Sequence, residues 1–310
     1  MTDLQTEPRE AELHSVRAHL RERSAATRAR RQLTSKVMVV LCWIAILCAA
    51  VPLLMLLFEL IDKGWPYVSS WAFYSQLPQQ PSITQPNNVG GASNAILGTV
   101  AVVAYAVVMA VPVGVVVGVF LAESDSKAAN VIRVITQTMV GAPSILMGLF
   151  AFYIIVKQLN LGYSALAGAF ALAVLMLPVL ATATEIAVRG VPPTYREAGL
   201  ALGAKPSTTS LRIVLPAAVS GIVTGSILAI SRAVGETAPV LLVIGGAYSM
   251  NWRPTDPVSM IPVQIYQDAS SAYPAQQNQV WGLALLLVAV VFVLSLFARI
   301  WAGRKQKERR

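Results

Sequence analysis

The sequence predicts an all-α integral membrane protein with six transmembrane helices, on three observations. The first is composition: 55% of the 310 residues are hydrophobic, 13% are charged and the mean hydropathy is +0.62. A soluble domain has about 25% charged residues. The second is a set of six apolar stretches, each close to the roughly 20 residues that a helix needs to cross a bilayer. The third is the distribution of basic residues among the connections.

The six apolar stretches give the expected spans. The third and fourth could be one long apolar block, but Lys157, Gln158, Asn160 and Gly162 interrupt it, which favours a tight hairpin between two helices. A run of 36 mostly polar residues precedes the first stretch, unlike a cleaved signal peptide. We place the spans near residues 37–61, 94–122, 135–157, 163–187, 219–246 and 280–302.

These spans divide the chain into four parts. Residues 1–36 form a basic N-tail, and residues 37–93 hold the first span and an extracytoplasmic loop. Residues 94–302 form the transmembrane core, whose longest internal connection is 188–218, and residues 303–310 form a basic C-tail. The N-tail suits either an interfacial helix on anionic lipid or a solvated, disordered tail.

Basic residues predict the orientation of these spans. Lys and Arg number 24 against 15 Asp and Glu, a net charge of +9. Twenty of the 24 fall in the N-tail, in 123–134, in 188–218 and at the chain end from Arg299. The opposite side holds three: Lys63, Lys157 and Arg253. The positive-inside rule therefore predicts that both termini are cytoplasmic, and the basic excess reflects topology and not nucleic-acid binding.

Residues 188–218 predict a short cytoplasmic helix. Thr194 is a candidate N-cap with Glu197 three residues later, as in a capping box. The helix would run from Glu197 to Ala204, and Lys205-Pro206 would stop it. It has a small-residue face that lets another protein's backbone approach closely; an amphipathic connector between spans is the alternative. That face consists of Ala198, Gly199, Ala201 and Gly203.

The same residues resemble the cytoplasmic motif of permeases of ABC importers, which reads E-A-A, three residues, G, nine residues, I-x-L-P. Here Glu197-Ala198-Gly199 is followed at those spacings by Gly203 and by 213–216, IVLP. Gly199 stands where the family has its second alanine. The resemblance implies that Glu197 to Gly203, with Arg196 and Lys205, contact a separate ATPase subunit. ATP and Mg would then be used by that partner, and this chain would bind no cofactor itself.

Four further segments are similar to phosphate-importer permeases of the PstA family. They are NAILGTV (94–100), VPVGVVVGVFLAE (111–123), GAPSILMGLF (141–150) and RAVGETAPVLL (232–242). The resemblance implies import of inorganic phosphate with a second, PstC-like permease, a PstB-like ATPase dimer and a PstS-like extracytoplasmic binding protein. Alternatives are another oxyanion (sulfate, molybdate or phosphonate) or a secondary anion transporter.

The sequence gives no sign of an enzyme. It contains no GxxxxGK[ST] phosphate loop, and both histidines lie in the N-tail, away from any serine–histidine–aspartate arrangement. We therefore expect no catalytic and no metal site in this chain.

Arg232 and Glu236 are the only charged residues between Arg212 and Arg253. We expect Arg232 about midway along the fifth span, where a charge costs roughly 2.5–3.5 kcal/mol on insertion scales. Residues four apart share one helix face, so the two side chains either pair to lock the packing or face one anion pathway. An arginine fork suits phosphate because it can bond two oxygens at once.

Neighbouring residues complete this candidate pathway. Ser231 and Thr237 could donate hydroxyls at the same level, although buried hydroxyls often bond their own helix. Glu236 could hold Arg232 when no substrate is bound, or could accept the proton of hydrogen phosphate. Pro239 is expected to kink the span.

Overall fold

The computed structural model describes residues 7–79, 89–250 and 253–307, with only the backbone described for 7–30, 33 and 301–307. Within these ranges the chain is helical, and its only β-type pairings are two isolated bridges, Pro78 with Gly90 and Gly245 with Val258. The expected all-α fold is confirmed. The chain divides into two units, Met1–Glu59 and Leu60–Arg310.

The first unit consists of most of helix α1 (Glu7–Val68). From Thr34 onward this helix is long and apolar enough to span a membrane. The backbone is helical from Glu7, which agrees with the helical interpretation of the N-tail. Contact of that tail with lipid stays a prediction.

The second unit contains the remaining helices. In chain order they are α2 (Trp71–Ser75), α3 (Ser93–Glu123), α4 (Lys127–Gly141), α5 (Ser144–Ala151), the π-helix η1 (Phe152–Gln158), α6 (Ala165–Arg189), α7 (Pro193–Ala201), α8 (Pro206–Thr209), the π-helix η2 (Ser210–Val214), α9 (Leu215–Val234), α10 (Ala238–Leu241), α11 (Ile261–Ala269) and α12 (Pro274–Lys307).

Helix α6 is the centre of the second unit. The most apolar stretch of α6 is 72% buried, whereas the corresponding stretches of α3 and α12 are 28% and 11% buried. Small residues allow its neighbours to approach: Gly114 of α3 lies against Leu180, and Gly118 against Thr184. The core formed around α6 includes the fully buried side chains of Val102, Leu172, Met176, Leu180, Ile244 and Met260.

The third expected span, 135–157, is not a single straight helix. α4 and the α5–η1 segment together are apolar enough to cross a membrane, but they meet at an angle of 106°. The break falls at Ala142–Pro143, and Ala142 is extended with φ −73° and ψ 140°. Proline has no N–H and pushes the preceding residue out of the helical region. Among the described residues, five single helices are long and apolar enough to cross a membrane, or six spans if this bent pair counts as one.

The fifth expected span, 219–246, is also wrong in its extent. Its helical segment begins earlier, at Pro206, and ends at Val234. The expected kink at Pro239 is replaced by a break before it, because Pro239 is the second residue of the new helix α10. A proline at that position loses no helical hydrogen bond.

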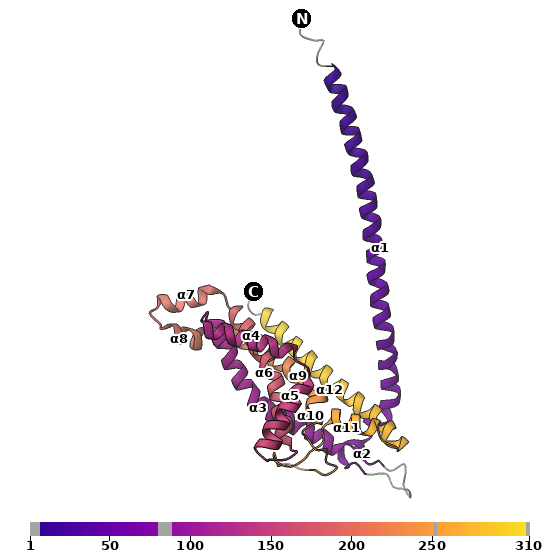
Figure 1. Ribbon diagram of the computed structural model, residues 1–310, viewed down its shortest axis with the longest axis vertical. Helices are drawn as coiled ribbons and strands as arrows, with labels where there is room; N and C mark the ends of the chain where they lie inside the picture. The colour runs from indigo at the N-terminus through magenta and orange to yellow at the C-terminus, as the bar shows by residue number, and fades with distance from the viewer. Residues whose placement is uncertain (1–6, 80–88, 251–252, 308–310) are drawn as a thin grey trace. The chain divides into compact units, whose positions relative to one another are not determined.

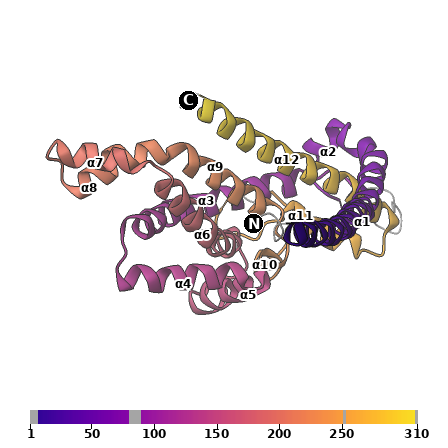
Figure 2. The ribbon, with the colours of Figure 1, turned by 90° about the horizontal axis from the view of Figure 1, so that it is seen from above.

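The two ends of the second unit carry different elements (Figure 1). α7 and α8 lie at one end, near the start of α4, and α2 and α11 lie at the other. Viewed from above, α4 and α5 flank one side of α6 and α12 lies on the other side, beyond α9 (Figure 2). The two groups of candidate residues are therefore separated along α9, with the α7 group at one end and Arg232 farther along.

Candidate functional site

Arg232 and Glu236 form an ion pair at the end of α9. Arg232 Nε lies 3.3 Å from Glu236 Oε1. Arg232 is in the last turn of α9, Gly235 is the C-cap, and Glu236 lies beyond the helix with its N–H 3.3 Å from the Ala233 carbonyl oxygen. The predicted pairing is confirmed, but the expected position of Arg232 midway along its own helix is wrong.

The pair nevertheless lies level with the middle of α6. β-Carbons built at Gly221 and Gly225 of α9 would lie 2.7 and 2.5 Å from the β-carbons of Ala187 and Ala183. The two helices thus run antiparallel, and this register brings Arg232 level with Met176, near the centre of α6. Helix α9 therefore ends inside the bundle, which explains how a helix terminus and a mid-span charge coincide.

Arg232 lines a small pocket at this level. α4, the α4–α5 break and α6 supply its walls, and 52% of the Arg232 side chain remains exposed, against 20% for Glu236. An arginine beside such a pocket offers hydrogen-bond donors in a planar fork. The other lining residues are Met139, Val140, Ala142, Met147, Leu175, Pro178 and Val179.

The two hydroxyl residues have unequal positions. Ser231 is buried and its Oγ donates to the Ile227 carbonyl oxygen at 2.8 Å, so this hydroxyl bonds its own helix. Thr237 is half-buried and precedes α10, where its carbonyl oxygen accepts from the Leu241 N–H at 3.0 Å. Thr237 thus lies in the break beside Glu236, whereas Ser231 is turned into the helix packing.

A helix forms where the sequence predicts the coupling helix, but its boundaries differ from those expected. α7 begins at Pro193, so Thr194 lies inside the helix and is not its N-cap. It ends at Ala201, before Gly203, whose φ of +79° suits glycine, and Lys205-Pro206 begins α8 instead of stopping α7. Proline at the first helical position outweighs the capping-box pattern here.

The predicted coupling residues divide into exposed and inward-facing sets. Glu197, Ala198, Gly203 and Lys205 are exposed. Gly199 is buried: a β-carbon there would lie 2.8 Å from Thr209 Cγ2 and 2.9 Å from Ile213 Cδ1. The small size of Gly199 is thus explained by packing of α7 on α8 and η2, and the interpretation of Gly199 as part of a contact face for another protein is wrong.

Arg196 also faces inward. Its Nη2 lies 2.9 Å from Glu123 Oε1 of α3 and 3.1 Å from the Val188 carbonyl oxygen of α6, and its Nη1 donates to the Val191 carbonyl oxygen at 3.2 Å. Arg196 therefore ties α7 to the ends of two long helices, in contrast to the exposed Glu197 beside it.

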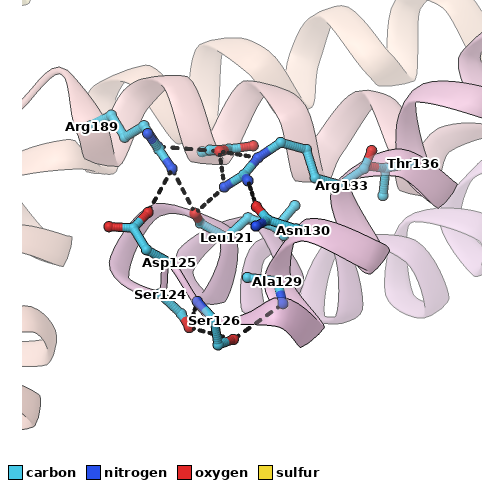
Figure 3. Close-up of polar contacts among 10 residues, drawn as sticks. Leu121, Ser124, Asp125, Ser126, Ala129, Asn130, Arg133, Thr136 and Arg189 are labelled. Carbon is cyan, nitrogen blue, oxygen red and sulfur yellow. Dashed lines mark hydrogen bonds and ion pairs between the residues drawn. The ribbon is translucent and has the colours of Figure 1, made fainter.

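Sequence reasoning missed a second group of charges, centred on Glu185 of α6. Arg133 Nε donates to Glu185 Oε1 at 3.1 Å, and Arg189 Nε lies 3.2 Å from the same oxygen. Both guanidinium groups also donate to the Leu121 carbonyl oxygen at the end of α3 (Figure 3). The available signal was a carboxylate in an apolar stretch with an arginine four residues away, the spacing that Arg232 and Glu236 have in the opposite order.

Comparison with known proteins shows the family of this chain. Residues 114–307 match the family described as binding-protein-dependent transport system inner membrane component. The chain is 34% identical to the phosphate transport system permease protein PstA of Haemophilus influenzae over 278 residues, which are 89% of this chain and 96% of that protein. It is 37% identical to PstA 1 of Mycobacterium tuberculosis H37Rv over 288 residues, 90% of this chain and 91% of that protein. The expected resemblance to the PstA family is confirmed.

A solved structure supports the fold. The methionine ABC transporter MetNI in an inward-facing conformation aligns with a TM-score of 0.52 and 22% identity, over 68% of this chain and 92% of that one. Together with the matched residues 114–307 and the several apolar helices of this multi-pass membrane protein, these likenesses lead to one conclusion. The chain belongs to the binding-protein-dependent transport system inner membrane components, the permease family of ABC importers.

Proposed function

We propose that this chain is the permease subunit through which an ATP-driven importer carries inorganic phosphate across the bacterial inner membrane. The relatives named as phosphate transport permeases, 34 to 37% identical over about nine-tenths of the chain, support the substrate. The observation that carries the proposal is the half-exposed side chain of Arg232, which lines a small pocket level with the middle of α6.

The chemistry of the Arg232–Glu236 pair fits an anion in transit. A charge at mid-membrane depth is costly unless it is paired, and Glu236 partners Arg232 through one Nε contact. More than half of the arginine side chain is still exposed. An incoming phosphate competes with Glu236 for the guanidinium, because a fork of N–H groups can bond two phosphate oxygens at once.

Glu236 has two roles in this proposal. It holds Arg232 in place when no phosphate is bound. It also accepts a hydrogen bond from the protonated oxygen of hydrogen phosphate, which sulfate lacks near neutral pH. Thr237, in the break beside Glu236, adds a hydroxyl at the same level. Ser231 has the weakest part in the pathway because its hydroxyl bonds the Ile227 carbonyl oxygen.

The energy for transport comes from a partner in this proposal. The sequence contains no GxxxxGK[ST] phosphate loop, so an ATPase dimer uses ATP and Mg and docks on the exposed residues of the α7 region, Glu197, Ala198, Gly203 and Lys205. The basic connections 123–134 and 188–218 support a cytoplasmic position for that end and, by the same rule, for both termini. A second, PstC-like permease completes the pore, and a phosphate-binding protein docks on the opposite end.

Uptake of labelled phosphate tests the proposed substrate. Vesicles containing the two permeases, the ATPase dimer and the binding protein should import phosphate only with ATP, and excess sulfate should not compete. Arg232→Ala should abolish uptake while the complex still assembles with its ATPase. Equal competition by sulfate would refute phosphate selectivity, and normal uptake by Arg232→Ala would exclude this residue from the pathway.

A further inference from the structure

We infer that five charged residues at the α7 end, Glu123, Arg133, Glu185, Arg189 and Arg196, transmit movement of α7 to the transmembrane helices. We call them the arginine cluster. The inference deepens the proposed function, since it rests on α7 being the contact point of the ATPase. It assigns these residues a positioning role and no contact with substrate.

The inner part of the cluster joins three helices at one point. Glu185 of α6 is 14% exposed and its Oε1 contacts both Arg133 of α4 and Arg189 of α6. Arg133 Nη2 and Arg189 Nη2 donate to the Leu121 carbonyl oxygen of α3 at 3.0 and 3.1 Å (Figure 3). Arg133 also donates to Asn130 Oδ1 at 2.7 Å. One carboxylate thus orients two guanidinium groups toward a single carbonyl oxygen.

Helix ends explain why these contacts are directional. The last carbonyl groups of an α-helix have no partner within the helix, and its C-terminus carries partial negative charge. Leu121 is two residues from the end of α3, so the two guanidinium groups satisfy a group that would otherwise need water. Because charge-assisted hydrogen bonds are short and strong, the end of α3 is fixed relative to α4 and α6.

The outer part of the cluster connects α7 to this point. Arg196 of α7 contacts Glu123 of α3 at 2.9 Å and the Val188 carbonyl oxygen of α6 at 3.1 Å. Glu123 is two residues from Leu121 on the same helix. A displacement of α7 is therefore transmitted through this contact to the end of α3, where Arg133 and Arg189 donate to the Leu121 carbonyl oxygen.

This polar connection complements an apolar one. Gly199 of α7 packs on Thr209 and Ile213, which lead directly into α9 and so toward Arg232. The arginine cluster instead leads into α3 and α6, which form much of the core, and into α4, which with α6 supplies pocket walls facing Arg232. Movement of α7 can thus displace both sides of the proposed pathway together.

Cysteine accessibility tests the cluster without relying on the substrate. Cys42 and Cys48 are changed to serine, and Val140→Cys, at an exposed residue lining the Arg232 pocket, serves as the probe. In the assembled complex, ATP should change the labelling rate of this cysteine by a water-soluble thiol reagent. Adding Glu185→Gln removes a charged partner, so the ATP-dependent change in the labelling rate should fall by about tenfold. Assembly of the complex and basal ATP hydrolysis should stay unchanged.

Asp125→Asn is the matched control. Asp125 lies 3.9 Å from Arg189 but is 98% exposed, and exposed ion pairs contribute little to stability. The ATP-dependent change in labelling of the Asp125→Asn variant should therefore equal that of the parent. An unchanged ATP response in Glu185→Gln would overturn the inference. So would a proportional loss of assembly, ATP hydrolysis and labelling change, which indicates a merely structural role.

Variants of Glu123 keep the inference testable if Glu185→Gln is poorly folded. Glu123→Gln should reduce the ATP response because it removes the charged partner of Arg196 Nη2, whereas Glu123→Asp keeps a carboxylate and should retain more of the response. An unchanged ATP response in Glu123→Gln would overturn the inference. Absence of phosphate uptake in the parent complex would instead refute only the proposed substrate.

Discussion

Gly148 of α5 packs directly against the backbone of Pro239 in α10. A β-carbon built at Gly148 would lie 2.4 Å from the Pro239 carbonyl oxygen and 2.6 Å from its Cα. Both residues border breaks: α5 follows the 106° bend after α4, and α10 follows the interruption that contains Glu236. Their contact holds two interrupted segments together next to the Arg232 pocket.

Replacing Gly148 should therefore damage the proposed pathway. The added methyl group of Gly148→Ala meets backbone atoms that cannot rotate away, so α5 and α10 must separate. We expect a loss of about 1–3 kcal/mol in stability, as for overpacked cores, and a strong loss of uptake, measured by thermal unfolding and vesicle transport. Gly141→Ala is the control, because a β-carbon at Gly141 meets nothing within 4 Å. Equal behaviour of the two variants would contradict this packing argument.

Gly199 offers a second test, of inward packing against partner contact. Gly199→Ala places a methyl group 2.8 Å from Thr209 Cγ2. This close contact should lower the free energy of unfolding by more than the roughly 1 kcal/mol that alanine adds through its helix propensity. Thr209→Ser removes that Cγ2 but keeps Oγ1, which with Ile213 Cδ1 would still lie 2.9 Å from the new β-carbon, so the double variant should recover part of the lost stability. A thermal-unfolding cycle of the four proteins measures the coupling, and strictly additive effects would show that the two residues do not press on one another.

The sequence predicts the fold well because membrane spans are encoded locally. Apolar length locates the six stretches, and the spacing of Arg232 and Glu236 predicts their ion pair, which forms even though α9 ends between them. That helix end is not predictable in the same way. It depends on α10 packing against Gly148, a contact between residues about 90 positions apart in the chain.

The orientation of side chains at the α7 end is the other feature that sequence could not predict. Motif spacing identifies the family of Glu197–Gly203 but does not say which side of the helix is buried. Gly199 turns inward because Thr209 and Ile213 lie beneath it. Arg196 turns inward because Glu123, 73 residues away, and the Val188 and Val191 carbonyl oxygens accept its hydrogen bonds there.

The roles of Arg232 and Glu236 can be separated by conservative variants. Arg232→Lys keeps the positive charge but loses the planar fork, so phosphate uptake should fall by about tenfold or more with little change in thermal unfolding. Glu236→Gln should lower uptake or weaken rejection of sulfate, as measured by competition in vesicles. Ser231→Ala should leave uptake nearly unchanged, because its hydroxyl bonds Ile227. Glu236→Gln with normal uptake and normal sulfate rejection would eliminate both proposed roles of this carboxylate.

Asp268 of α11, outside the membrane-spanning helices, should make stability depend on pH. The residue is 1% exposed, and Gln264 Nε2 donates to its Oδ2 at 3.1 Å. Burial raises the pKa of the Asp268 carboxyl from 3.8 to about 6, with the Gln264 hydrogen bond opposing the rise. The folded protein thus holds this proton more tightly than the unfolded chain, so the contribution of Asp268 to stability is complete below pH 3.8 and is lost as pH rises through about 6.

Asp268→Asn cannot ionise, and its unfolding temperature in the purified complex should fall less than that of the parent between about pH 5 and pH 7.5. Parallel pH profiles for the two proteins would show that Asp268 ionises no differently in the folded and unfolded states.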